Sequence, residues 1–289
     1  MNIEEICSNL EPEKTCRDII NINYPKKDDY SICDYALDHI PSTNIAPYHG
    51  IKIFKNYAIK KSLKQFKIFS EENNQNLLSI INKTDFIQNY PLYNYGVRTT
   101  YDIIPKYNKI QVITPGYISA YHMPKKIYIV DIISLGHEHC HALKETNYKE
   151  HQNALIIGEV IPIFYELINY ENDFLRIKYL QNRLFFLNEQ KEIYLELKNQ
   201  IKTNNTNEIK SIYEYTKSLY SSYLGGFYYA LTLYSMYKKD PLKILNMVND
   251  VLSHKITTID MLKRLNLYRS ILGQKFEYEI TNMKKVLSK

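Results

Sequence analysis

The run of residues 136–141 constrains this chain more than any other feature, because three of its six residues are histidines. Within it, His137, Glu138 and His141 have the spacing His-Glu-x-x-His. On an α-helix, residues four apart lie about 40° apart around the axis, so His137 and His141 face the same way and can share one metal ion. Glu138 lies about 100° from His137 and can hold a water bound to that ion without being a ligand itself. The spacing therefore predicts a metal site built on one helix.

A catalytic zinc ion needs a third protein ligand, and the residues after this helix offer one. Glu159 and Glu166 are seven residues apart on one face of a second predicted helix, roughly 10 Å apart along its axis. The sequence favours Glu159 as the ligand and Glu166 as a residue that orients a histidine or a nearby tyrosine. Glu166 and His151 remain alternatives for the third ligand. Pro162 disrupts helical hydrogen bonding, so this helix either begins near Ile161 or kinks at the proline.

The other ligand-type side chains of the first helix point elsewhere. His139 lies about 200° from His137, among the apolar residues that would pack this helix on the core, and it is expected to be a core or boundary histidine. Cys140 lies about 60° from the ligand face and is expected to be an inert, packed thiol. The apolar side of the helix comprises Ile132, Leu135, Ala142 and Leu143.

A longer series of stretches surrounds these residues. It runs through Gly116–His122, Lys126–Val130 and Leu135–Ala142, and it ends with Glu159 and Glu166. This order resembles the gluzincin metallopeptidases, and among them most the thimet oligopeptidase and oligoendopeptidase F family. That family has a Gly-containing segment, an apolar strand, Leu-x-His-Glu-x-x-His-Ala, and a helix with two glutamates seven residues apart. The resemblance covers about residues 110–170.

The resemblance implies a zincin-like fold with His137, His141 and Glu159 as zinc ligands and Glu138 as general base. It also implies that an extended substrate adds to an edge strand in the place of Ile118–Tyr121. An interior strand without substrate contact is the alternative.

A weaker echo of the family lies near residues 220–240. The family carries tyrosines there that donate hydrogen bonds to the oxyanion of the transition state. With 28 tyrosines in this chain, an aromatic packing stripe explains the group better. The candidates are Tyr223, Tyr228, Tyr229 and Tyr234.

The whole pattern predicts an α+β fold with a small antiparallel sheet, whose edge strand lies next to the His-Glu-x-x-His helix, followed by a mostly helical C-terminal part. Strands over 117–122 and 126–131 are expected to form a hairpin. Three regions follow one another: a mainly helical 1–100, a catalytic core 101–172, and a helical bundle 173–289 that completes the cleft.

Further elements follow from apolar periodicity and from turn residues. Helices are expected over 3–9, 30–38, most of 51–81, 173–201, a stretch ending near 223, 227–239, 242–252 and 258–272. Strands are expected over 101–104 and 109–114. Gly225 and Gly226 are expected to interrupt the helical pattern.

Composition excludes several classes of function. The net charge of +6 comes from interspersed charges of both signs, which indicates a solvated surface and no nucleic-acid partner. No apolar stretch is suited to span a membrane, and a membrane partner is not expected. The four cysteines form no C-x-x-C pair, and Met1–Glu5 lacks the basic residues of a signal peptide. A cytoplasmic location is therefore expected.

The sequence thus predicts a zinc-dependent metallopeptidase that acts on a peptide or protein substrate, with Zn²⁺ as cofactor. The alternative is a non-catalytic zincin-like domain that binds peptides or a partner protein. A metal-dependent hydrolase of non-peptide substrates would use the same ligands. The sequence indicates no oligomeric state.

Overall fold

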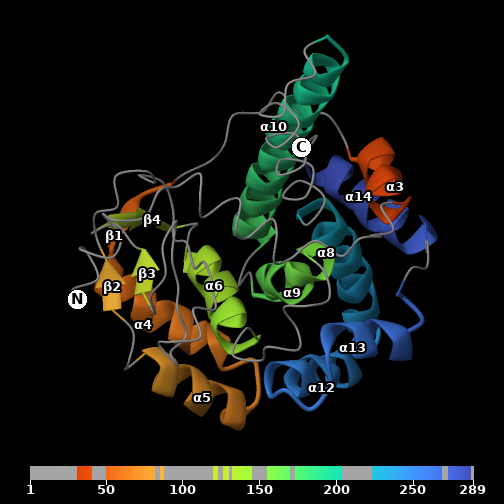
Figure 1. The fold of residues 1–289 in the computed structure, drawn as a ribbon. Coiled ribbons are helices and arrows are strands. Elements are labelled where there is room, and N and C mark those ends of the chain that lie inside the picture. The colour runs from red at the N-terminus through yellow and green to blue at the C-terminus, as the bar shows by residue number, and fades with distance from the viewer. Residues whose placement is uncertain are drawn as a thin grey trace. The chain divides into compact units, whose positions relative to one another are not determined.

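In the computed structural model most of the described residues are helical, and the described strands are three residues long (Figure 1). The described residues are 31–40, 50–81, 85–87, 120–122, 126–129, 132–144, 155–169, 173–203, 223–268 and 273–287. They belong to two compact units, and each unit is assembled from three separate stretches of chain. The first unit comprises Met1–Pro25, His49–Asn153 and Leu245–Thr257, and the second comprises Lys26–Tyr48, Ala154–Ile244 and Thr258–Lys289. The three consecutive regions expected from the sequence stay a prediction.

The first unit is built around helix α6, which carries the His-Glu-x-x-His residues. Three residues of α4 at four-residue spacing, Ala58, Ser62 and Phe66, are fully buried, and α4 packs against α6. Helix α5 also packs against α6. The elements of this unit are β1 Lys52–Phe54, α4 Lys55–Phe66, α5 Glu71–Ile81, β2 Asp85–Ile87, β3 Ala120–His122, β4 Lys126–Tyr128, α6 Ile132–Lys144 and most of α12 Pro241–Leu252.

The described strands form two pairs instead of the single small antiparallel sheet expected from the sequence. β1 pairs antiparallel with β4, and this register places Ile53 opposite Ile127. β2 pairs parallel with β3. The predicted hairpin between 117–122 and 126–131 is therefore wrong, because β3 and β4 each have a different partner. Neighbouring strands in the sequence need not pair with each other. Here Lys52-Ile53-Phe54 lies antiparallel to Lys126-Ile127-Tyr128, so that each lysine lies opposite an aromatic residue and the two isoleucines lie opposite each other.

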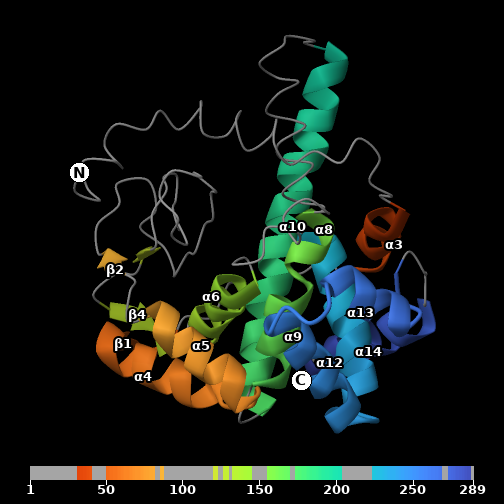
Figure 2. The same ribbon diagram turned by 60° about the horizontal axis from the view of Figure 1, so that its bottom comes forward.

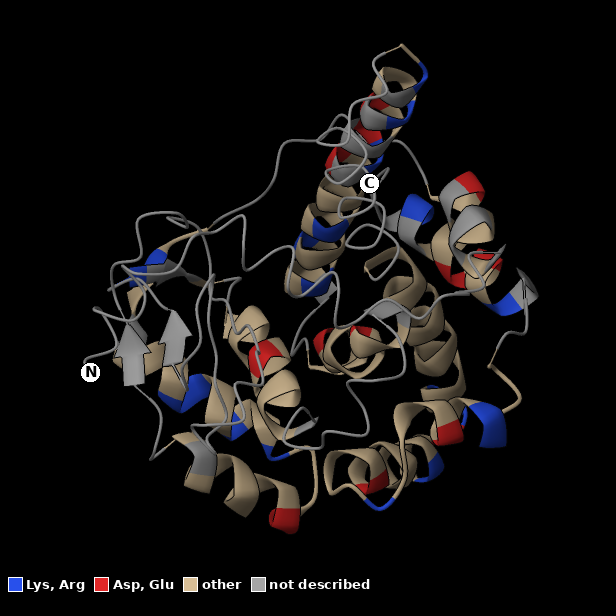
Figure 3. Cartoon of the chain, in the orientation of Figure 1, with Lys and Arg blue, Asp and Glu red and all other residues tan. Residues whose placement is uncertain are grey.

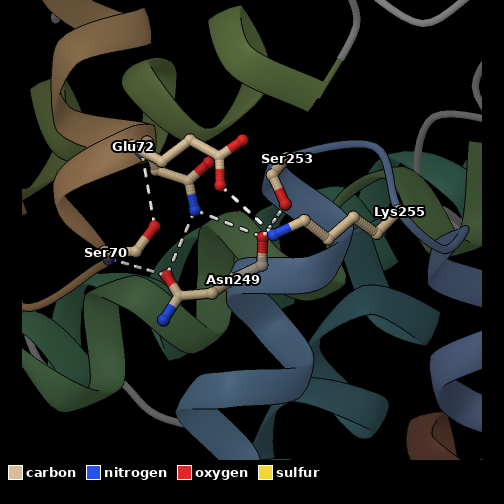
Figure 4. A network of polar contacts seen from close by, with 6 residues as sticks. Ser70, Glu72, Asn249, Ser253 and Lys255 are labelled. Carbon is tan, nitrogen blue, oxygen red and sulfur yellow. Dashed lines mark hydrogen bonds and ion pairs between the residues drawn. The ribbon is translucent and has the colours of Figure 1, made fainter.

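Helix α12 is tied to the start of α5 by a polar network (Figure 4). Ser70 caps α5, because its Oγ accepts a hydrogen bond from the N–H of Asn73 at 3.3 Å. The Oδ1 atom of Asn249 accepts hydrogen bonds from the Ser70 N–H at 2.9 Å and from the buried Asn73 amide at 3.1 Å. At its exposed side, Lys255 pairs with Glu72 at 3.2 Å. The network thus joins two helices that are far apart in sequence.

Over its described residues the second unit contains helices and turns but no strand. α10 is its longest described element, with 31 residues, and it packs against α14 (Figures 1 and 2). Tyr179, Leu180, Leu184 and Leu187 are buried near the start of α10, and they recur at the three- and four-residue spacing of one helix face. The elements are α3 Ser31–His39, α8 Leu155–Gly158, α9 Val160–Ile168, α10 Asp173–Thr203, a helix over 223–237, α13 Thr258–Arg264 and α14 Gly273–Leu287.

The expected break at Gly225 and Gly226 is wrong. The helix over 223–237 runs through both residues without interruption, and both are buried. A glycine inside a helix costs about 1 kcal/mol relative to alanine, so glycine at such a place calls for a packing reason. At Gly226 the reason is the close approach of Glu159.

Most other expected helices of the described residues are confirmed, with shifted ends. α3, α10 and α12 match the predicted stretches 30–38, 173–201 and 242–252. The stretch 51–81 divides into β1, α4 and α5, and α13 ends at Arg264, well before residue 272. Helix α14 was not predicted as a separate element. The expected elements over 3–9, 101–104 and 109–114, and the stretch just before residue 223, lie outside the described residues.

None of the helices in the described part of the chain combines the length and the apolar character that a bilayer crossing needs.

Candidate metal centre

Helix α6 places His137 and His141 side by side. Their Nε2 atoms are 3.1 Å apart and their ring centroids 4.9 Å apart, and both side chains are buried. Two nitrogens bound to one tetrahedral zinc ion at about 2.0–2.1 Å are about 3.3 Å from each other. The two rings therefore already lie at the spacing of neighbouring ligands, a separation that a metal-free pair bridges with a hydrogen bond.

The opposite side of α6 anchors this helix in the core. Leu135, Ala142 and Leu143 are buried, and His139 is fully buried among such residues. The Nε2 atom of His139 lies 3.1 Å from the Oγ of Ser62 on α4, and burial lowers the pKa of His139 to about 3. The structure confirms the prediction that His139 is a core histidine. Cys140 is buried too, as predicted.

Glu159 occupies the turn between α8 and α9. It is the N-cap residue of α9, its carbonyl oxygen accepts the N–H of Ile163 at 3.0 Å, and its side chain is half-buried. α9 begins at Val160, so Pro162 falls in the first helical turn, where backbone N–H groups have no partner within the helix. The helix therefore starts just after Glu159, and the proline lies where it removes no hydrogen bond from within α9.

His137, His141 and Glu159 form a group that could hold a metal ion. One ligand atom from each residue lies within 4.8 Å of the other two. Neighbouring ligand atoms around a tetrahedral zinc ion are about 3.3 Å apart, so the limit of 4.8 Å in this group exceeds the spacing of a metal-loaded site by about 1.5 Å. Two imidazoles and a carboxylate suit zinc, although other divalent transition metals accept the same donors.

Glu138 is the residue after the first histidine on α6, and its side chain is only 8% exposed. It is not one of the three residues in the group of possible ligands. Acidic positions on α6 and α9 are visible in Figure 3. The role of Glu138 stays a prediction at this point.

Glu166 pairs with an arginine that the sequence did not single out. Both carboxylate oxygens of Glu166 accept hydrogen bonds from Arg183 of α10 at 2.6 Å, and the Glu166 side chain is 1% exposed. Burial by itself would lower the pKa of Arg183, but the charges of Glu166 and Glu159 raise it above its ordinary value. Glu166 lies outside the group of possible ligands. Its expected role in orienting a histidine or tyrosine stays a prediction.

The remaining candidates are less informative. His151 lies outside the described residues. The four candidate tyrosines all make ring contacts: Tyr223 with Phe186, Tyr228 with Tyr229 and Phe276, and Tyr234 with Tyr237. These contacts fit the aromatic packing stripe that the composition favours, and a role at an oxyanion stays a prediction.

Sequence reasoning missed two residues of this region, Arg183 and Gly226. Nothing in the local sequence distinguishes Arg183, which is 17 residues from its partner and on another helix. The pair Gly225-Gly226 stands out in the sequence, where it predicts a helix break. In the structure Gly226 instead allows close packing against Glu159.

Comparison of the chain with protein-family models, curated proteins and solved structures finds no match.

Proposed function

We propose that this protein is a zinc-dependent metallopeptidase of the gluzincin type. His137, His141 and Glu159 would hold the ion, and Glu138 would be the general base. The observation that supports this most is the group of two imidazoles and one carboxylate with ligand atoms within 4.8 Å of one another. Glu138 directly follows the first of these imidazoles in the chain. The donor set is that of catalytic zinc in metallopeptidases.

The residues of the chain divide the chemistry among them. A zinc ion supplies Lewis acidity and makes a water molecule acidic near neutral pH. His137 and His141 would hold the ion as neutral imidazoles, the form in which histidine binds a metal. Glu138 accepts the proton of the attacking water and passes it to the leaving amine of the scissile peptide bond. A domain that only binds peptides has no need for such an acid beside its ligands.

The proposed substrate is a peptide or protein, and the proposed location is the cytoplasm. The substrate class is supported by the resemblance of residues 110–170 to the oligopeptidase family. The resemblance assigns substrate binding to Ile118–Tyr121. Ala120 and Tyr121 of this stretch belong to β3, which pairs with β2.

Metal analysis together with a peptide-library digest tests this function. Wild-type protein purified without chelators should carry about one zinc ion per chain, and His141→Ala should lose it. Glu138→Gln should keep zinc but lose turnover by about 10²–10⁴-fold, because an amide accepts no proton.

Two results would contradict the proposal in different ways. A zinc-free wild-type protein would remove the metal site. Zinc binding without cleavage of any library peptide would favour the non-catalytic domain that binds peptides or a partner protein.

A further inference from the structure

Helix 223–237 approaches the proposed third ligand more closely than any side chain would allow. A methyl group added at Gly226 would overlap the Cβ atom of Glu159. It would also lie 3.2 Å from the carbonyl carbon and 3.3 Å from the Cα atom of Glu159. The obstacle is thus the backbone and the first side-chain atom of Glu159, which cannot rotate away. Only glycine lets this helix lie against the turn that carries the ligand.

The other end of α9 is held by a different kind of contact. Glu166, seven residues after Glu159, forms its ion pair with Arg183, and both oxygens take part at 2.6 Å. Both hydrogen bonds come from one nitrogen of the guanidinium, Nη2, and each is short because donor and acceptor are charged. Arg183 also attracts the Glu159 carboxylate electrostatically. Arg183 is itself held in place by Tyr179, whose hydroxyl accepts its Nε–H at 3.0 Å.

We propose that Gly226 and Arg183 are positioning residues that fix Glu159 as the third metal ligand. This inference rests on the proposed function. Gly226 seats the start of α9 against helix 223–237, and Arg183 fixes α9 to α10 two turns later. A ligand held at both ends of its segment has little freedom to leave the metal, and groups behind the ligands tune affinity in this way.

The chain offers a matched control for the glycine. Gly158 is the residue before Glu159, and a methyl group added there meets nothing within 4 Å. Gly226→Ala and Gly158→Ala therefore each add one methyl group near Glu159. Only the methyl group at residue 226 collides with Glu159.

The experiment measures zinc affinity by chelator competition, with thermal unfolding of the chelator-treated protein recorded beside it. Gly226→Ala should weaken zinc binding about 10–100-fold, and Gly158→Ala should stay within about twofold of the wild type. Both variants are also made in the Glu159→Gln background. If Gly226 acts through Glu159, Gly226→Ala should cause no further loss there.

The outcomes separate the two proposals. Wild-type zinc affinity in Gly226→Ala overturns the inference, and so does an equal loss with and without Glu159, which would indicate general destabilisation. If Gly226→Ala yields no folded protein, Arg183→Lys takes its place, because lysine keeps the charge but has no second nitrogen to hold Tyr179 while it binds Glu166. An unchanged affinity in Arg183→Lys overturns the inference. A wild-type protein that binds no zinc overturns the proposed function itself.

Discussion

Glu159 and Glu166 carry the same carboxylate two helical turns apart, yet their surroundings differ. Glu166 is buried against Arg183, whereas Glu159 is half-buried and belongs with His137 and His141 to the group that could hold a metal ion. We expect Glu159→Gln to weaken zinc binding by orders of magnitude, since a neutral amide is a poor zinc ligand. Glu166→Gln should weaken zinc binding much less and instead lower the stability of the chelator-treated protein by about 1–3 kcal/mol, because Arg183 loses a charged partner in the interior.

Competition with a chromophoric chelator, followed by calorimetry of each variant, checks this pair of substitutions. The opposite order of zinc affinities would exchange the roles of the two glutamates.

At the scale of helices, the contact between α5 and α12 provides the clearest test. Asn249→Ala removes the acceptor for the Ser70 N–H and for the fully buried Asn73 amide. We expect a loss of about 1 kcal/mol in the free energy of unfolding, because the Ser70 N–H loses its acceptor and the Asn73 amide keeps only the backbone carbonyl of residue 249.

Lys255→Ala is the matched control, since its pair with Glu72 lies in the same network but is more than half exposed on both sides. Urea unfolding should show little change for Lys255→Ala. Equal stabilities of the two variants would mean that Asn249 does not fasten α12 to α5.

Helices were largely predictable from the sequence, and strand partners were not. The apolar spacing of α12 encodes both the helix and its buried face, because the 3.6-residue period is a local property. The partner of β4 is β1, more than seventy residues earlier, and no local signal specifies it.

The metal group could be anticipated for a similar reason. The spacing of His137 and His141 fixes their common direction on one helix, and Glu159 stood out as an acid just before an apolar helix. The contacts behind the ligands could not be anticipated in this way. Arg183 and Gly226 act through segments that meet only in the folded chain, so their importance is a tertiary property.

For the molecule as a whole, a bound ion should contribute to stability. A metal that binds the native but not the unfolded chain adds about 2.7 kcal/mol when its free concentration is 100 times the dissociation constant. We expect zinc to raise the unfolding temperature of chelator-treated protein by several degrees in scanning calorimetry. His141→Ala should show no such rise. A rise of the same size in this variant would mean that the zinc binds elsewhere.

The division of the chain into interleaved units also affects how the protein is made. Leu245–Thr257 belongs to the first unit, and Ala154–Ile244 of the second unit comes before it in the chain. A ribosome adds about 5–20 residues per second, so the 104 residues from 154 to 257 take roughly 5 to 20 s to synthesise. During this interval the first unit lacks Leu245–Thr257, and Ser70 and Asn73 must wait for the Asn249 side chain that accepts their hydrogen bonds.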